Sequence, residues 1–174
     1  MIFEEAERKG LATELITRGG SDFRATTKSQ HPTDPMPWED VQKIRADNTC
    51  FLKEIVDKFS WPSNSLVGQT ASHWAWFIAQ HSDHDIDFQE KCLQLMKNLP
   101  KGDTNLPDLA HLEDRVRVNR GKKQLYGTQF SGATEQTMTL QPVEKPDELE
   151  IRRKEMGLEV PFEMYHNKTI AGQS

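Results

Sequence analysis

Two histidines and three aspartates are concentrated where an apolar stretch of the chain ends. The segment FIAQHSDHDIDF, residues 77–88, contains His81, Asp83, His84, Asp85 and Asp87. A carboxylate beside an imidazole fixes the tautomer of the ring and favours its protonated form, which suits acid–base catalysis near neutral pH. If the preceding helix continues, His84 and Asp85 lie three and four positions beyond His81 and share its face. We therefore predict that His81 or His84 is the catalytic base or acid and that Asp85 orients it.

The same residues allow two other interpretations. His81, His84 and Asp85 could bind a divalent metal, although helical zinc motifs space their histidines by four residues and a fourth ligand must come from elsewhere, with His73, His111 and Asp114 as candidates. Alternatively, the aspartates are helix caps, and Asp87 followed by Glu90 matches a capping box. Capping needs one aspartate rather than three, so the density of the cluster favours a functional site.

A second group of candidate residues follows later in the chain. In QLYGTQF, residues 124–130, Tyr126 and Gln129 offer a phenol and an amide to a ligand, and a glycine inside a strand often marks a close approach. Arg115 lies one position before an apolar residue of the preceding helix, from which it can reach an anionic group. Asn48 lies on the apolar stripe of an earlier helix and must find hydrogen-bond partners, either in a neighbouring helix or in a ligand. We include all four residues as candidates for substrate binding.

Hydrophobic periodicity predicts the elements that position these residues. Apolar residues recur at helical spacing in five segments: 38–59, 70–82, 88–99, 107–119 and 147–156. Two β-prone runs, 123–130 and 137–143, predict a β-hairpin across residues 123–143. The sequence thus predicts a mainly α fold of the α+β class, with about five helices and one small hairpin.

The domain organisation is predicted from composition. Residues 1–36 are expected to form a short helix, 1–18, followed by a flexible linker rich in Gly, Ser, Thr and Pro. A single domain is expected over residues 37–165, and a disordered tail over 166–174.

Charge and composition limit the partners. The net charge of −5 and the scattered basic residues argue against nucleic acid as a partner, and no apolar run is long enough for a membrane helix. Cys50 and Cys92 are far apart and lie in helical patterns, so we expect reduced core thiols in a cytoplasmic protein. A small-molecule substrate is expected, and a homodimer is compatible with the sequence.

The sequence lacks the motifs of several common enzyme classes. It contains no GxSxG, CxxC, P-loop or GxGxxG motif, which removes support for serine-hydrolase, nucleotide and flavin chemistry. We therefore expect a cofactor-independent enzyme that acts on a polar small molecule by cyclisation, elimination, isomerisation or hydrolysis, in a setting such as biosynthesis. A metal-dependent enzyme and a non-catalytic binding module are the alternatives.

Three longer stretches resemble a known family. WPSNSLVG with the following AWFIAQHSDHD, then LEDRVRVNRGKKQLYGTQF, and finally ELEIRRKEMGL are similar to small uncharacterised bacterial and fungal proteins with a domain of unknown function. The resemblance covers about residues 38–165 and implies a site and a mainly helical fold, but no particular activity. It adds Gln80 to the candidates for substrate binding. The matching positions are Gln80, His81, Asp83, His84, Asp85, Asp114, Arg115, Gly121, Tyr126, Gly127, Gln129 and Phe130. His73 and His111 fall outside the motif, which weakens a metal site that would need them.

Overall fold

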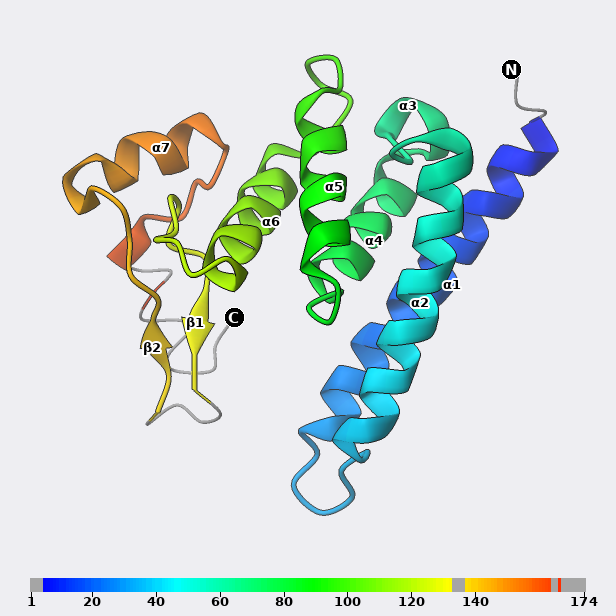
Figure 1. Ribbon diagram of the computed structural model, residues 1–174, viewed down its shortest axis with the longest axis horizontal. Coiled ribbons are helices and arrows are strands. Elements are labelled where there is room, and N and C mark those ends of the chain that lie inside the picture. Colours follow the sequence, from blue (N-terminus) through cyan, green and yellow to red (C-terminus); the bar gives the residue numbers. More distant parts are fainter. Residues whose placement is uncertain (1–4, 133–136, 164–165, 167–174) are drawn as a thin grey trace. The chain divides into compact units, whose positions relative to one another are not determined.

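The described part of the chain is mainly helical. The structure is a computed structural model that describes residues 5–132, 137–163 and 166 (Figure 1). These residues form seven α-helices and one short antiparallel sheet, which confirms the predicted fold class with two more helices than expected. The elements are α1 (Glu5–Ser29), α2 (Trp38–Phe59), α3 (Asn64–Val67), α4 (Gln69–Gln80), α5 (Ile86–Lys97), α6 (Leu106–Asn119), β1 (Phe130–Ser131), β2 (Thr139–Leu140), the 3₁₀ turn η1 (Pro146–Glu148) and α7 (Leu149–Glu155).

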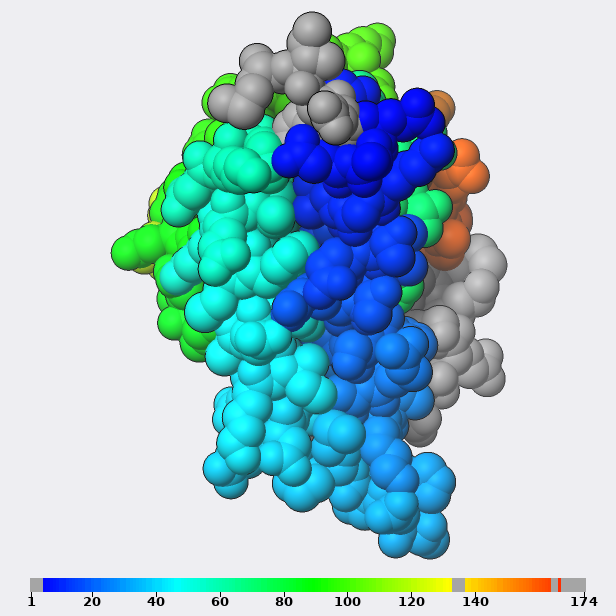
Figure 2. Space-filling model, turned by 90° about the vertical axis from the view of Figure 1, so that its right-hand side faces the viewer, coloured from blue at the N-terminus to red at the C-terminus, as the bar shows by residue number. Residues whose placement is uncertain are grey.

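The chain divides into two compact units, residues 1–105 and 106–174. The first unit contains α1 to α5. In it, α1 packs against α2 and α4, and Figure 2 shows α1 in blue and α2 in cyan lying side by side. The second unit contains α6, the small sheet and α7. The single domain predicted over residues 37–165 stays a prediction.

The predicted linker is wrong over residues 19–29, because these residues form the second half of the 25-residue helix α1. The glycines there serve close packing rather than flexibility. A Cβ atom added to Gly19 would lie 2.6 Å from Cε3 of Trp74 on α4, so only glycine lets the two helices approach this closely. Leu11, Leu15, Asp22 and Ala25 are also buried, which means that α1 is part of the core.

The corner between α4 and α5 differs from the continuous helix that was expected. The helix α4 ends at Gln80, and His81 has C-cap geometry with φ −94° and ψ 6°. His81, His84 and Asp85 therefore do not share a helical face. Asp85, and not Asp87, is the N-cap of α5, where its Oδ1 accepts a hydrogen bond from the backbone N–H of Phe88 at 3.0 Å. Asp87 lies in the first turn of α5, where a carboxylate favours the helix dipole.

The predicted hairpin is much shorter than residues 123–143. Among the described residues, only Phe130–Ser131 and Thr139–Leu140 pair as antiparallel strands, with Phe130 opposite Leu140, and an isolated parallel bridge joins Gln124 to Val143. The strand predicted over 123–129 is therefore wrong. The backbone of Gln124 and Gln129 bonds to residues 141–144, but the backbone between them forms a loop that bonds to side chains. Residues 133–136 of the expected turn and all of the predicted tail except His166 lie outside the described residues.

The two cysteines have different surroundings. Cys92 is fully buried, and burial raises the pKa of its thiol, which keeps the sulfur neutral. Cys50 is exposed on α2, which corrects the expectation of two core thiols. In the described residues, none of the helices is both long and apolar enough to pass through a membrane.

Candidate functional site

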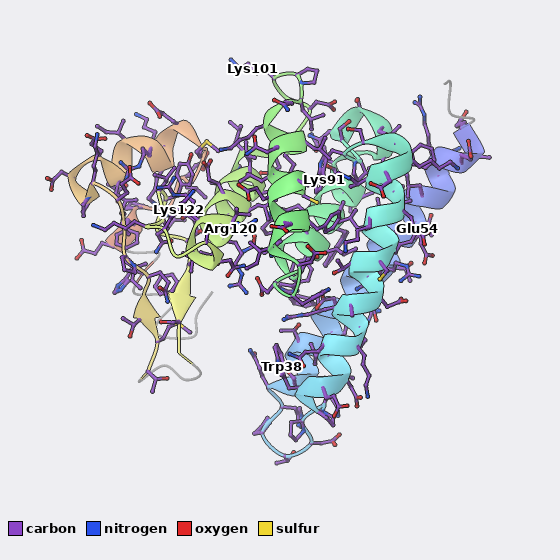
Figure 3. All side chains as sticks on the ribbon, in the orientation of Figure 1. Trp38, Glu54, Lys91, Lys101, Arg120 and Lys122 are labelled. Atoms are coloured by element: carbon purple, nitrogen blue, oxygen red, sulfur yellow. The ribbon has the colours of Figure 1, made fainter. Side chains whose placement is uncertain are left out.

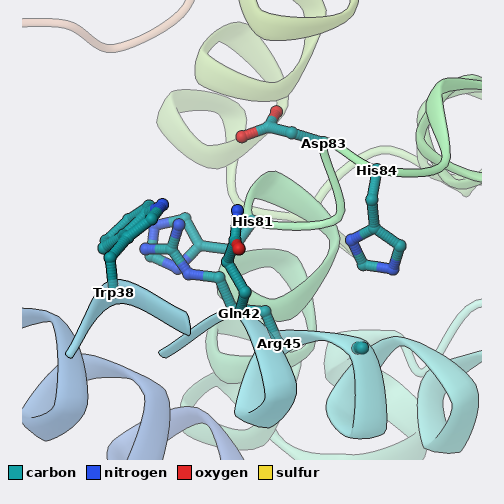
Figure 4. Close-up of a pocket in the computed structure, with 7 residues that line it drawn as sticks. Trp38, Gln42, Arg45, His81, Asp83 and His84 are labelled. Atoms are coloured by element: carbon teal, nitrogen blue, oxygen red, sulfur yellow. The ribbon is translucent and has the colours of Figure 1, made fainter. Parts of the chain in front are cut away.

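A pocket of about 390 Å³ lies between the first half of α2 and the loop that follows α4. Figure 4 shows Trp38, Gln42 and Arg45 on α2, with Asp83 and His84 on the loop. The lining residues are Trp38, Gln42, Arg45, Ala46, His81, Asp83 and His84. Two of the three residues predicted to be catalytic, His81 and His84, therefore line the same pocket, which lies within the first unit.

His81 forms a close pair with Asp22 of α1. Its Nδ1 lies 3.0 Å from Oδ2 of Asp22, and its ring meets the edge of Phe77 with 4.3 Å between the centroids. An ionised carboxylate can only accept, so Nδ1 must carry the hydrogen in this contact. In the neutral ring, Nε2 is then unprotonated and can accept a proton. Asp22 thus holds His81 in the tautomer that a general base needs.

The carboxylate of Asp22 is fully buried and shared among three donors. Its Oδ1 accepts from Nε of Arg45 at 3.2 Å and from Oγ1 of Thr26 at 3.2 Å, while Oδ2 faces His81. Burial by itself would raise the pKa of Asp22, but the hydrogen bond from His81 and the charges of His81 and Arg45 outweigh it and lower the pKa. The carboxylate is therefore charged at neutral pH despite its burial.

Asp22 is not among the residues predicted from the sequence, because it lies in the stretch that was expected to be a linker. A signal for its position does exist in the sequence. Leu11, Leu15, Gly19, Asp22 and Ala25 are spaced by four, four, three and three residues, which is the spacing of one helix face. A single acidic residue on an apolar helical stripe needs a buried partner. The spacing and the charge together therefore identify Asp22 as a candidate residue.

Arg45 connects the buried carboxylate to the pocket. Besides its bond to Asp22, its Nη2 donates to Oγ1 of Thr26 at 3.0 Å, and the side chain is 11% exposed. The centre of its guanidinium group lies 4.9 Å from the ring centroid of Trp38, in a cation–π contact. Trp38 is the first residue of α2 and remains 51% exposed (Figure 3).

The roles predicted for His84 and Asp85 have different outcomes. His84 is exposed and lines the pocket, which leaves its predicted acid–base role untested. Asp85 is bonded to Lys53 and to the backbone of Phe88, and these two contacts, that of Lys53 first, lower the pKa of Asp85. Its carboxylate caps α5, and the carboxylate that orients His81 is that of Asp22.

Asn48 and Gln80 are not among the residues that line this pocket. Asn48 is buried, and its Nδ2 donates to the backbone oxygen of Arg18 at 3.3 Å. It therefore bonds to a neighbouring helix, which is one of the two alternatives expected from the sequence. The Oε1 atom of Gln80 is buried and accepts no hydrogen bond from the described residues. Nothing in these contacts supports a substrate-binding role for either residue.

In the second unit, Asp114 organises the loop that was predicted to be a strand. The buried carboxylate accepts hydrogen bonds from the backbone N–H groups of Leu125 at 2.6 Å, Tyr126 at 3.1 Å and Thr128 at 3.1 Å. It also accepts one from Oγ1 of Thr128 at 3.0 Å. Burial raises the pKa of Asp114, and these hydrogen bonds oppose the shift. A single side chain thus takes the place of the missing partner strand.

The other face of the loop is held by residues that follow in the chain. Arg152 Nε donates to the backbone oxygen of Leu125 at 2.8 Å, and Arg153 Nη1 donates to that of Tyr126 at 2.7 Å. Gly127 has φ +69°, and an added Cβ would lie 2.7 Å from the ring of Phe162. The glycine therefore makes room for Phe162 and not for a ligand.

The predicted substrate-binding residues of this unit bond to other residues of the same unit. Arg115 Nη1 donates to Oε1 of Gln129 at 3.2 Å, and Gln129 is buried. The hydroxyl of Tyr126 lies 3.4 Å from Oε2 of Glu113, and burial, followed by the nearby carboxylates, raises the pKa of Tyr126 to about 12. These contacts stabilise the loop around Asp114. Substrate binding by Arg115, Tyr126 and Gln129 stays a prediction.

The metal-dependent alternative receives no support from the described side chains. Among residues 5–132, 137–163 and 166, no three or more His, Cys, Asp or Glu side chains are grouped so that they could hold one metal ion. Asp85, one of the three predicted ligands, is bonded instead to Lys53 and Phe88.

The fold and the site define a mainly helical protein whose first unit contains a buried carboxylate paired with a histidine. Residues 24–169 match the sequence model described as "Family of unknown function (DUF6624)", and the chain belongs to this family. This confirms the resemblance noted in the sequence. No curated protein and no solved structure matches the chain.

Proposed function

We propose that this protein is a cofactor-independent enzyme that uses His81 as a general base on a polar small molecule. The observation that carries the proposal is the 3.0 Å contact between His81 Nδ1 and the buried carboxylate of Asp22, beside a pocket that His81 itself lines. A buried carboxylate, an imidazole and an adjacent cavity are the parts that acid–base catalysis requires.

In the proposed reaction, Nε2 of His81 accepts a proton from the substrate and returns it at a later step. Asp22 orients the ring and stabilises the imidazolium that forms, because its charge lies next to Nδ1. His84, on the pocket wall, is the second candidate for proton transfer. Cyclisation, elimination, isomerisation and hydrolysis can all use such a proton relay, and the contacts do not favour one over another.

The cellular setting belongs to the same proposal. We propose a cytoplasmic protein whose partner is a small molecule rather than nucleic acid. Both cysteines are free thiols, and the net charge is −5 with scattered basic residues. These features are typical of a reducing compartment and of weak attraction to phosphate backbones.

A second candidate function is a non-catalytic binding module in which the His81–Asp22 pair only stabilises the fold. The observation that favours it is the position of Asp22, whose contacts join α1 to Arg45 of α2 and to His81 beyond α4. In that case, replacing His81 should lower stability and leave no chemical activity to be lost.

Incubation of the protein with a metabolite extract tests the two candidates. Species that disappear or accumulate are followed by mass spectrometry for the wild-type protein, for His81→Asn and for His31→Gln. Asparagine keeps a donor near Asp22 but has no basic nitrogen. We expect conversion by the wild type, loss of at least about a hundredfold in His81→Asn and full activity in His31→Gln, whose histidine is exposed and outside the pocket.

Two results would contradict the proposal that this protein is an enzyme. One is a folded His81→Asn variant that converts the same metabolites at the wild-type rate. The other is a wild-type protein that converts none of them, which would favour the binding module.

A further inference from the structure

The pocket contains a guanidinium group with one occupied and one open edge. Nε and Nη2 of Arg45 point along the same side of the planar group, and they donate to Asp22 and Thr26. Nη1 forms no hydrogen bond with the residues that the structure describes. The end of the group, formed by Nη1 and the second hydrogen of Nη2, is therefore available in a side chain that is fixed in place. This end matches the two oxygens of a carboxylate.

An exposed aromatic surface lies directly beside this end. Trp38 contacts the Arg45 guanidinium at 4.9 Å and is 51% exposed, although tryptophan gains more than most side chains from burial. Figure 4 places Trp38 and His84 at opposite sides of the pocket. An indole held open next to a fixed guanidinium can stack against a flat part of a ligand while the arginine binds its charge.

The remaining lining residues favour an anion over a cation. The wall contains the guanidinium, two imidazoles and the amide of Gln42, against one carboxylate, that of Asp83. Asp83 already accepts a hydrogen bond from Nε2 of the buried Gln89 at 3.2 Å. Because Asp22 lies behind Arg45 and compensates its charge, recognition rests on directed hydrogen bonds more than on net charge.

We propose that this pocket binds a small carboxylate with an adjoining flat, conjugated group. Its carboxylate pairs with the open end of Arg45, its flat group lies against Trp38, and the part to be deprotonated faces His81. This ligand proposal rests on the proposed function only for the role of His81, because binding to Arg45 and Trp38 needs no turnover.

Binding of simple probes tests the inference. Benzoate carries both features, benzamide has the same shape without the charge, and acetate has the charge without the ring. We expect benzoate to bind at least about tenfold more tightly than either, because a charge-assisted bidentate pair and ring stacking each contribute. The reporter is the indole N–H resonance of Trp38 in ¹H–¹⁵N spectra, assigned by its loss in Trp38→Leu.

Variants assign the two contacts. Trp38→Leu lacks the reporter indole, so its binding is followed by the backbone ¹H–¹⁵N resonance of Ala46 in the pocket wall. This variant should bind benzoate about fivefold more weakly and acetate as the wild type does. Arg45→Lys should reduce the preference for benzoate over benzamide, because lysine keeps the charge but cannot form the two-pronged pair. Arg24→Gln, an exposed arginine on α1 outside the pocket, is the matched control and should bind benzoate like the wild type. If Arg45→Lys does not fold, the inference is tested by the affinities of the wild type for the three probes and by benzoate binding to Trp38→Leu.

The test separates this inference from the proposed enzyme. Benzoate should still bind His81→Asn, which lacks the base but keeps Arg45 and Trp38. Equal binding of benzoate and benzamide, shifts that leave the Trp38 resonance unchanged, or no saturable binding of benzoate would each overturn the inference. Conversion of metabolites by the wild type together with such a result would leave the enzyme proposal standing and the ligand class wrong.

Discussion

At the residue scale, the site depends on the different hydrogen-bond partners of the two carboxylate oxygens of Asp22. One oxygen faces His81 and the other accepts from Arg45 and Thr26, so a single buried charge contacts both the proposed base and the residues that join α1 to α2. A buried ion pair stabilises a protein only while both charges are present. If one charge is removed, the other remains buried without a counter-charge, and the free energy of unfolding decreases.

The Asp22→Asn variant separates charge from shape. The amide leaves Arg45 without its buried counter-charge and can present N–H to His81, which would shift the ring hydrogen to Nε2 and remove the base. We expect loss of activity and a decrease of about 3 kcal/mol in the free energy of unfolding. The decrease is measured by urea denaturation with tryptophan fluorescence.

Asp47→Asn is the matched control for Asp22→Asn. Asp47 also joins α2 to α1, through Nη1 of Arg18 at 2.6 Å, but its side chain is 73% exposed. Removing its charge should therefore cost less than about 1 kcal/mol. An equal decrease in the free energy of unfolding in the two variants would show that burial does not determine how much the contacts of Asp22 stabilise the protein.

At the element scale, α1 shows why composition is a poor guide to a packed helix. Gly, Ser and Thr have low helix propensity, and the sequence around Gly19 and Gly20 therefore indicated a linker. In the structure, tertiary contact with α4 outweighs propensity, as is usual for helices in proteins. Among the helices with clear apolar periodicity, α2 was predicted with its exact bounds, 38–59, and α4, α5, α6 and α7 with bounds within two residues of those observed.

The loop of residues 124–129 was mispredicted for a related reason. Its β-prone residues suggested a strand, but a strand forms only where a partner can bond its backbone. Here the carboxylate of Asp114 and the guanidinium groups of Arg152 and Arg153 bond the backbone instead. Local sequence does not reveal which distant side chains will do so. The burial of Asp22 could be inferred from its place on the apolar stripe of α1, but not that its partner would be His81, 59 residues later in the chain.

Two glycines of α1 provide a matched test of the packing. Gly10 is exposed, with nothing within 4 Å of an added Cβ, whereas the Cβ at position 19 would meet Trp74 at 2.6 Å. Gly10→Ala should stabilise the protein by about 1 kcal/mol through helix propensity. Gly19→Ala should destabilise it by about 1 to 3 kcal/mol, because the ring must move. Stabilisation by both changes, measured by thermal denaturation, would contradict close packing of α1 on α4.

At the scale of the whole molecule, the two units can be followed by separate signals. All four tryptophans, at positions 38, 61, 74 and 76, lie in residues 1–105, so their fluorescence reports on the first unit. Far-UV circular dichroism reports on helices of both units. A pH-dependent transition seen by dichroism and not by fluorescence therefore belongs to the second unit.

His111 makes the second unit sensitive to mild acid. Burial, followed by the charge of Arg153, lowers the pKa of His111 to about 4, against 6.5 for an unperturbed histidine. Between these values the unfolded chain binds the proton and the folded chain does not, so the free energy of unfolding falls as the pH decreases. The loss begins near pH 6.5, ends near pH 4 and amounts to about 3 kcal/mol.

The His111→Gln variant isolates this contribution. Burial raises the pKa of Asp114, so this carboxyl increases the free energy of unfolding as the pH falls towards the ordinary pKa of an aspartate. The pKa of Asp22 is lowered, so this carboxyl decreases the free energy of unfolding only below about pH 4. Both persist in the variant, so the difference from wild type between pH 6.5 and 4.5 measures His111 alone. We expect a flatter stability curve for His111→Gln, followed by dichroism in urea, and the wild-type slope for His31→Gln. A wild-type slope in His111→Gln would mean that the imidazole of His111 takes up its proton in the folded protein as readily as in the unfolded chain.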